Sequence, residues 1–207
     1  MLEFTHHELT ADDIARLRQV YEPLTQSVRE LIDATIRTEV DAEAVADVIS
    51  QIDAVTARLR AKQLPGPFGV RYTGEGIGMA WGNPAIGVRN PIAPPLVLHH
   101  DGRTGKVSTD FHLGAPYEGP PGHVHGGVCA LVLDHVLGEA ASDPPRPALT
   151  GTITLRYLRA TRLGALHAEA TIERIEGVKT FAVGYLADDE GVTVEADGVF
   201  IVPKWAR

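Results

Sequence analysis

The stretch from Gly119 to Gly138 constrains this chain most, because a run of turn residues leads into a long apolar segment. It begins Gly-Pro-Pro-Gly-His-Val-His-Gly-Gly and continues without a helix breaker as far as Gly138. Apolar side chains leave the predicted helix no polar face: Val128, Cys129, Leu131, Val132, Leu133, Val136 and Leu137. A helix that is apolar all round is one that is buried on most sides. We therefore expect one central buried helix.

Two features of this helix indicate chemistry. Asp134 stands in its apolar middle, and a carboxylate removed from water costs several kcal/mol unless it is paired or kept for a reaction. Gly126 and Gly127 stand in the first turn, where backbone N–H groups have no partner within the helix. These amides and the helix dipole are suited to hold a carbonyl oxygen that becomes negative. The alternative for Asp134 is a carboxylate that only caps a strand or bonds across a dimer.

The spacing of these two features predicts an oligomer. Gly126 and Asp134 are eight residues apart, which is roughly 12 Å along a helix axis. Both cannot touch one reacting carbonyl if they come from the same helix. We therefore expect a site built across a two-fold dimer, in which one chain supplies the amide and the other supplies the carboxylate.

Composition narrows the class of protein. The 207 residues suffice for one domain with an extension. A net charge of −8 without a long basic run argues weakly against nucleic acid as the main partner. The single cysteine, Cys129, excludes a disulfide framework and is interpreted as a small buried residue. No signal peptide is visible and no apolar run approaches the ~20 residues of a membrane span, so we expect a cytoplasmic protein.

Residues 10–62 predict a helical hairpin after a loose lead-in over residues 1–9. Thr10 and Asp13 form a capping box at the first helix, which Pro23 should break or kink. A second helix starts at Asp41 and carries one apolar stripe: Val45, Val48, Ile49, Ile52, Val55 and Leu59. We interpret residues 1–64 as an arm lying on the main domain or on a partner chain, with a lid or a protein-binding segment as the alternative.

Residues 65–207 predict the main domain. Alternating apolar residues or turn signals indicate strands over residues 70–73, 78–82, 96–100, 106–113, 150–158, 166–175, 179–187 and 192–202. The third and fourth form a hairpin, a loop over 142–147 follows the helix, and the last strands form a meander. This is an α+β plan, and a long antiparallel sheet wrapped around the helix would explain why no face of the helix is polar.

These residues resemble the hotdog-fold thioesterases, above all the PaaI-type branch and its mammalian thioesterase-superfamily-member relatives. The matching positions are Gly-Pro-Pro-Gly122, His125-Gly126-Gly127, Asp134, Thr150, Tyr157-Leu-Arg159, Glu176-Gly-Val-Lys179 and the segment 195–202. The likeness spans about 95–202 and leaves out the helical arm.

The resemblance implies hydrolysis of an acyl thioester, usually of a fatty or aromatic acyl-CoA, without cofactor or metal. It implies a homodimer or a dimer of dimers. It assigns the oxyanion donor to Gly126 and the carboxylate to Asp134 of the opposite subunit, with His125 and Thr150 completing the site. One position departs from the pattern: some members have Asn or Gln where this chain has Gly119.

Two further groups of residues have competing interpretations. A basic set could hold the phosphates of CoA, with Arg159 and Lys179 beside Gly127 as substrate-binding residues, or could be solvated strand-edge charges. The other members of the set are Arg156 and Arg162. The histidines suggest a metal, but no Cys or acidic residue stands at ligand spacing, which argues against zinc. They are His99, His100, His123 and His125, whereas His135 is interpreted as a core or dimer-facing histidine.

Three functions compete at this point. The first is an acyl-CoA thioesterase. The second is a non-catalytic module that binds acyl-CoA or lipid and keeps the fold as a scaffold. The third is a hotdog dehydratase or hydratase, which usually places an Asp and a His together near the helix start, a pattern absent here. Release of free thiol from acyl-CoA would discriminate among them.

Overall fold

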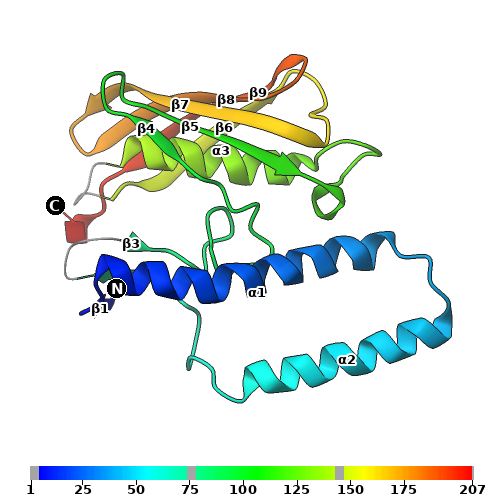
Figure 1. Cartoon of the computed structure of the whole chain (residues 1–207). Helices are drawn as coiled ribbons and strands as arrows, with labels where there is room; N and C mark the ends of the chain where they lie inside the picture. The colour runs from blue at the N-terminus through cyan, green and yellow to red at the C-terminus, as the bar shows by residue number, and fades with distance from the viewer. Residues whose placement is uncertain (1–4, 74–77, 143–146, 207) are drawn as a thin grey trace. The chain divides into compact units, whose positions relative to one another are not determined.

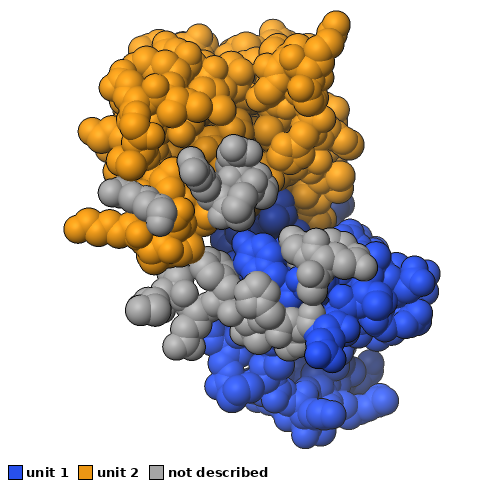
Figure 2. Space-filling view, turned by 90° about the vertical axis from the view of Figure 1, so that its left-hand side faces the viewer, with its two compact units in different colours: residues 1–92 blue, residues 93–207 orange. Residues whose placement is uncertain are grey.

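A computed structural model describes residues 5–73, 78–142 and 147–206. The chain divides into two compact units, residues 1–92 and residues 93–207, which Figure 2 colours separately. This division falls later in the chain than the boundary after residue 64 that the sequence suggests. Each unit is described by itself.

Unit 2 is one sheet and one long helix (Figure 1). The helix is α3, Gly126–Ala141. The strands are β4 (His99–Asp101), β5 (Lys106–Leu113), β6 (Leu149–Tyr157), β7 (Gly164–Glu176), β8 (Lys179–Asp188) and β9 (Gly191–Ile201). Their order is β4-β5-β7-β8-β9-β6, and every neighbouring pair is antiparallel. β6 therefore forms one edge of the sheet.

Helix α3 packs along the concave side of this sheet, as its apolar sequence predicts. It contacts β5, β6, β7, β8 and β9, and it buries Cys129, Val132, Leu133, Val136, Leu137, Ala140 and Ala141. Small residues on the strands let the helix approach closely: a Cβ added to Gly184 would lie 2.8 Å from Leu137 Cδ1 and 2.5 Å from the carbonyl oxygen of Glu169. The predicted hotdog fold, a sheet wrapped around a buried helix, is confirmed.

Most predicted strands of unit 2 are confirmed within about one to three residues. The exception is the strand expected over 96–100, since β4 covers only His99–Asp101 and the preceding residues follow Pro94 and Pro95 without pairing. Part of the loop predicted over 142–147 lies outside the described residues. A short 3₁₀ helix, Ala115–Tyr117, precedes the turn into α3, and another, Lys204–Ala206, follows β9.

Unit 1 holds a small three-stranded sheet beside two long helices. Its strands are β1 (Thr5–His7), β2 (Arg71–Thr73) and β3 (Gly78–Met79). β1 pairs in parallel with β2, so residues 5–7 are not the loose lead-in that their polar sequence indicates. The strand predicted over 78–82 ends at Met79, because Trp81 and Gly82 enter a turn in which Asn83 donates its backbone N–H to the carbonyl of Ala80.

Helix α1, Ala11–Arg37, begins at the predicted capping box. Thr10 Oγ1 accepts from the Asp13 amide, while the Asp13 carboxylate accepts from the Thr10 amide at 2.9 Å. Of the break or kink expected at Pro23, the break does not occur, because α1 runs through this residue as one uninterrupted helix. A proline removes one intrahelical hydrogen bond, and the remaining turns of a 27-residue helix keep it continuous.

Helix α1 packs on a loop of its own unit through its middle turns. Thr25 is buried, and Arg29 donates to the carbonyl oxygens of Gly87 and Asn90 at 3.3 and 3.0 Å. The guanidinium of Arg89 lies 3.7 Å from the centre of the Tyr21 ring.

Helix α2, Ala42–Arg60, contrasts with α1, because none of its residues is buried. Its side chain cap is the predicted Asp41, which accepts from the Ala44 amide at 2.9 Å. None of the helices in the described ranges, α2 included, combines the length and the apolar character needed to cross a membrane.

Candidate active site

The loop that leads into α3 ends at His125, which caps the helix with its side chain. His125 Nδ1 accepts a hydrogen bond from the Gly127 amide at 3.0 Å. Acceptance at Nδ1 places the ring proton of a neutral imidazole on Nε2. A Cβ at Gly127 would lie 3.2 Å from the His125 ring, so glycine at this position leaves room for the capping histidine. The predicted site residue His125 therefore holds the first turn of α3 in shape.

The amide of Gly126 has no hydrogen-bond partner among the residues that the structure describes. Its carbonyl oxygen accepts from the Tyr157 hydroxyl at 2.8 Å, and the Tyr157 ring lies 3.4–3.5 Å from the position of an added Cβ. Burial against this turn raises the pKa of Tyr157, so the phenol stays protonated and remains a donor. The helix start thus presents one open N–H group in a turn fixed by His125 and Tyr157.

Asp134 meets Thr150 across the space between α3 and β6. The Thr150 hydroxyl donates to Asp134 Oδ1 at 2.8 Å, and the Asp134 side chain is only partly buried. The structure therefore brings together two of the predicted site residues. Thr150 leaves Oδ2 of the carboxylate without a side-chain partner among the described residues.

The open amide and the carboxylate pair lie apart within one chain. Gly126 and Asp134 belong to one regular helix, which separates them by roughly 12 Å along its axis. The residues of β6 that contact these two groups are also far apart, since Thr150 and Tyr157 stand near opposite ends of the strand. One chain alone therefore does not place both groups on one thioester.

The departure at Gly119 has a steric cause. A Cβ at this position would lie 2.7 Å from the Cα atom of His125, a distance that side chains do not adopt. The Gly119 amide donates to the His123 carbonyl at 2.9 Å, while the His125 amide donates to the Tyr117 carbonyl at 2.9 Å. This loop therefore excludes a side-chain amide at position 119.

Arg159, one of the predicted substrate-binding residues, is engaged within its own chain. Its guanidinium forms a two-pronged ion pair with Asp188 and donates to the Gly191 carbonyl at 2.8 Å. The guanidinium and the hydrogen bonds that the carboxylate accepts hold the pKa of Asp188 well below its usual range. This geometry favours the structural interpretation of Arg159 over a contact to CoA.

The same ion pair supports the turn before α3. Asp188 also accepts from the Arg162 amide at 3.2 Å, and the adjacent Thr161 carbonyl accepts from the Val124 amide at 2.8 Å. Lys179 is different, because within the described part of the chain it makes no ion pair. The remaining members of the basic set pair with neighbours, Arg156 with Glu195 and Arg162 with Glu190.

Cys129, His135 and His123 lie in surroundings that do not mark them as reactive groups. Cys129 is buried, as predicted, and burial raises the pKa of its thiol. Burial also lowers the pKa of His135, against the opposing charges of Glu139 and Asp134. His123 Nδ1 lies 2.8 Å from the Pro121 carbonyl oxygen. Among the side chains that the structure describes, those of residues 8–73, 78–142 and 147–206, no three of His, Cys, Asp or Glu cluster as metal ligands would.

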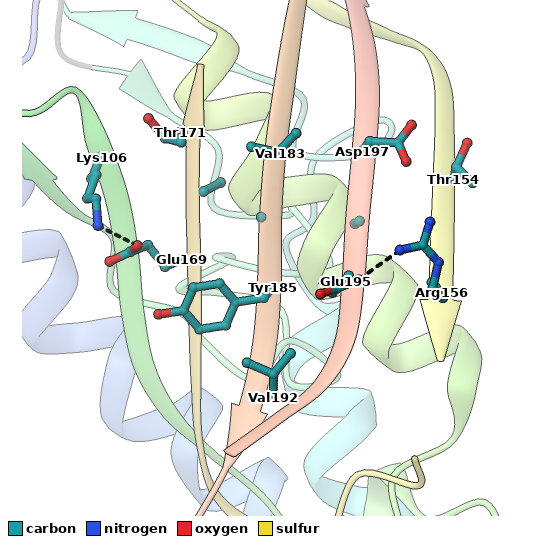
Figure 3. A pocket seen from close by; sticks show the side chains of 13 residues that line it. Lys106, Thr154, Arg156, Glu169, Thr171, Val183, Tyr185, Val192, Glu195 and Asp197 are labelled. Atoms are coloured by element: carbon teal, nitrogen blue, oxygen red, sulfur yellow. Dashed lines mark hydrogen bonds and ion pairs between the residues drawn. The ribbon is translucent and has the colours of Figure 1, made fainter. Parts of the chain in front are cut away.

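A concavity of about 460 Å³ lies elsewhere, on the face of the sheet turned away from α3 (Figure 3). A row of charged and aromatic side chains crosses the strands there, with Lys106 paired to Glu169 and Arg156 paired to Glu195 on either side of Tyr185. Neither Asp134 nor Gly126 lines it. We therefore separate this hollow from the candidate active site.

Comparison with known proteins identifies the family. The model of the thioesterase superfamily matches residues 121–195, which contain α3 and most of the meander. Two curated relatives match as well. The acyl-coenzyme A thioesterase THEM4 of Xenopus laevis is 33% identical over 94 residues, 44% of this chain and 42% of the relative. The MIOREX complex component 3 of Saccharomyces cerevisiae is 24% identical over 160 residues, 76% of this chain and 56% of the relative.

The chain spans about half the length of these curated relatives. A solved structure matches over most of both chains. It is a crystal structure of a thioesterase superfamily protein, 31% identical, covering 87% of this chain and 94% of the other with a TM-score of 0.77. The buried helix with its open first-turn amide, the Asp134–Thr150 pair and this likeness agree, and the chain belongs to the thioesterase superfamily.

Proposed function

We propose that this protein is an acyl-CoA thioesterase that hydrolyses a fatty or aromatic acyl-CoA to the free acid and CoA. The observation that carries the proposal is the pair of Asp134 on α3 and Thr150 on β6, at 2.8 Å. The first turn of the same helix α3 presents the Gly126 amide, which has no partner in the described chain. The curated relative that is 33% identical over 94 residues is named an acyl-coenzyme A thioesterase, which supports the class of substrate.

The proposed site is shared between two subunits that meet along β6. This strand is an edge of the sheet with mostly exposed residues, and an unpaired edge is a template for another strand. A two-fold axis between Ile153 and Thr154, near the middle of β6, would pair the strand antiparallel with its copy. It would set Thr150 of one chain beside Tyr157 of the partner subunit, about one strand spacing of ~5 Å away.

That pairing would also bring the reacting groups together. Within each chain Thr150 is hydrogen-bonded to Asp134, and Tyr157 is hydrogen-bonded to Gly126. The axis would therefore place Asp134 of one subunit near Gly126 of the other. Within one helix the two groups are roughly 12 Å apart. In this dimer a single thioester would contact Gly126 of one α3 and Asp134 of the other. A symmetric dimer would contain two such sites.

The chemistry follows from the two groups. The Gly126 N–H would hold the thioester oxygen as it becomes negative, a contribution of ~3–4 kcal/mol to the barrier in comparable sites. Asp134 would take a proton from water as the water oxygen bonds to the carbonyl carbon, or would itself attack that carbon. In either route the C–S bond then breaks, and the CoA sulfur leaves as a thiolate that gains a proton. After direct attack the acyl group is held on Asp134 as an anhydride, and water then cleaves this anhydride to release the acid and restore the carboxylate. Thr150, by donating to Oδ1, would orient Asp134 for either role.

Lys179 is the proposed contact for the CoA phosphates. Its strand pairing runs from Lys179 to Ile201 and from Ile201 to Leu149, the residue before Thr150. Lys179 therefore lies at the same end of the sheet as the carboxylate pair and has no ion pair in the described chain. A lysine ammonium binds phosphate as a point charge.

The test is release of free thiol from a panel of aliphatic and aromatic acyl-CoAs by the purified chain. We expect turnover that falls by roughly 10²–10⁴-fold in Asp134→Asn, while circular dichroism and molecular mass stay unchanged. Near-normal turnover of that variant would refute the assignment of the carboxylate. Binding of acyl-CoA by the unaltered protein without any thiol release would instead support a non-catalytic binding module.

A further inference from the structure

Helix α2 carries an apolar stripe that nothing in the described part of its own unit buries. All five members with exposed side chains have between 39% and 54% of their surface open, although they lie on one side of a regular helix: Val45, Val48, Ile49, Val55 and Leu59. Ile52, in the middle of the stripe, is partly exposed. Scattered apolar residues are normal on a surface, but a continuous apolar stripe is typical of an interface.

Five of the six members of the stripe are arranged symmetrically about Ile52, whereas Val48, four residues before it, has Thr56 as its counterpart four residues after it. Ile49 stands three residues before this centre, and Val55 stands three residues after it. Val45 and Leu59 stand seven residues before and after. Since one turn takes 3.6 residues, these offsets keep all five side chains on one face. A surface that repeats itself on reversal is self-complementary under a two-fold axis through its centre.

The charges of α2 are complementary in the same orientation. The N-terminal end of the helix is acidic and the C-terminal end is basic. The acidic residues are Asp41, Glu43 and Asp47, and the basic residues are Arg58, Arg60 and Lys62. On a regular helix Glu43 and Asp47 project away from the stripe, so Asp41 at one end and Arg60 and Lys62 at the other are the charges that flank it. In an antiparallel pair of α2 helices, each acidic end lies beside the basic end of the other helix. A parallel pair would set like charges together, which costs free energy.

We infer that α2 docks on α2 of a second copy of this chain, antiparallel and centred on Ile52. The stripe from Val45 to Leu59 is roughly 21 Å long, and helices this short pair weakly by themselves. The contact therefore adds to another contact between chains and strengthens it through high local concentration. The inference rests on the proposed function only in that the other contact is the one proposed along β6, and thiol release and helix pairing are measured separately.

Cysteine cross-linking tests this pairing directly. Val45→Cys and Leu59→Cys proteins are treated with a short bismaleimide, each alone and as a mixture of the two. We expect a cross-linked pair of chains only in the mixture, since antiparallel packing sets position 45 near position 59 of the other chain and keeps equal positions roughly 21 Å apart. Ile52→Cys alone should cross-link to its own copy.

The native cysteine does not interfere, because Cys129 is buried, and the unaltered protein serves as the blank. Ser50→Cys, on the side of α2 opposite Ile52, is the matched control and should not cross-link. Efficient cross-linking of Val45→Cys alone would overturn the antiparallel arrangement. No cross-linking above the Ser50→Cys control at any stripe position would overturn the pairing altogether.

Discussion

Helices α3 and α2 are both rich in apolar residues, yet their surroundings differ completely. α3 buries seven of its 16 residues under the sheet, whereas α2 buries none of its 19. The sheet of its own unit covers one side of α3, while Val128 and Leu131 elsewhere on the helix stay partly exposed. α2 is apolar on one side only, and that side needs a single flat partner. The difference teaches that a uniformly apolar helix indicates cover within the chain for at least one of its sides, while a one-sided stripe leaves the identity of its cover open.

The largest effect is expected on the free energy of unfolding when a leucine is replaced by alanine in α3, compared with the same replacement in α2. Leu137→Ala in α3 removes a side chain that is 0% exposed, and Leu59→Ala in α2 removes one that is 49% exposed. We expect the free energy of unfolding to fall by about 2–5 kcal/mol for the first and by less than about 1 kcal/mol for the second. Urea denaturation at low protein concentration measures both. Equal losses would show that the stripe on α2 is covered within the chain.

The fold of unit 2 could be predicted because its signals are local. The uniformly apolar segment around Val132 and the alternation in β6 to β9 depend only on neighbouring residues, and the cap between Thr10 and Asp13 is equally local. The predicted break at Pro23 does not occur, because one lost hydrogen bond is a small part of those that hold a 27-residue helix. The strand at Thr5–His7 escaped notice because its pairing with β2 joins residues far apart in the chain.

The candidate site was predictable to the extent that its chemistry stands in one segment. Gly126, His125 and Asp134 are marked by an unusual glycine pair and an acid in an apolar helix. Tyr157 was not singled out as a site residue, since a tyrosine at a strand end carries no signal of its contact with Gly126. The pairing of Arg159 with Asp188 was also hidden, because the two residues come from separate turns.

In the described chain the first turn of α3 presents the unpartnered N–H group of Gly126, and removing this N–H tests its part in catalysis. In Gly126→Pro the N–H is lost, while proline is tolerated at the first helical position and the extended backbone of His125 suits a following proline. We expect kcat to fall by roughly 10²–10³-fold.

Gly126→Ala is the matched control, because it keeps the N–H and its Cβ meets the Tyr157 ring at ordinary contact distances of 3.4–3.5 Å. Its kcat should stay within a few-fold of the unaltered protein, roughly the size of a small packing change. An equal loss in both variants would mean that shape, rather than the donor, is what position 126 supplies.

The support of the turn before α3 should depend on pH. Because the folded pKa of Asp188 is depressed, its carboxylate stabilises the fold above its unfolded value of about 4, and this stability is lost as pH falls through the folded value. The Asp188 side chain is only 2% exposed, and Asp188→Asn should cost about 1.5–3 kcal/mol at neutral pH. Thermal melts should show the gap to the unaltered protein narrowing below about pH 4. A gap independent of pH would contradict this role.

The smallest effect is expected where α3 meets the edge strand. Thr150→Val keeps the shape of the side chain and removes the hydrogen bond of 2.8 Å to Asp134. Such a bond is worth about 1 kcal/mol, so kcat should fall by roughly tenfold or less. Thr152→Val, on the same strand and without a side-chain hydrogen bond in the described chain, is the control and should leave kcat unchanged. A loss as large as that of Asp134→Asn would give Thr150 a direct part in the reaction.

Mixing two inactive proteins tests the shared site most directly. Asp134→Asn and Gly126→Pro chains are unfolded and refolded together, so that mixed dimers form. In a shared site, one of the two sites in each mixed dimer regains an unaltered Asp134 and an unaltered Gly126. The account predicts recovery of roughly one quarter of normal thiol release. A mixture as inactive as its separate components would show that each chain builds its own site and would contradict the account.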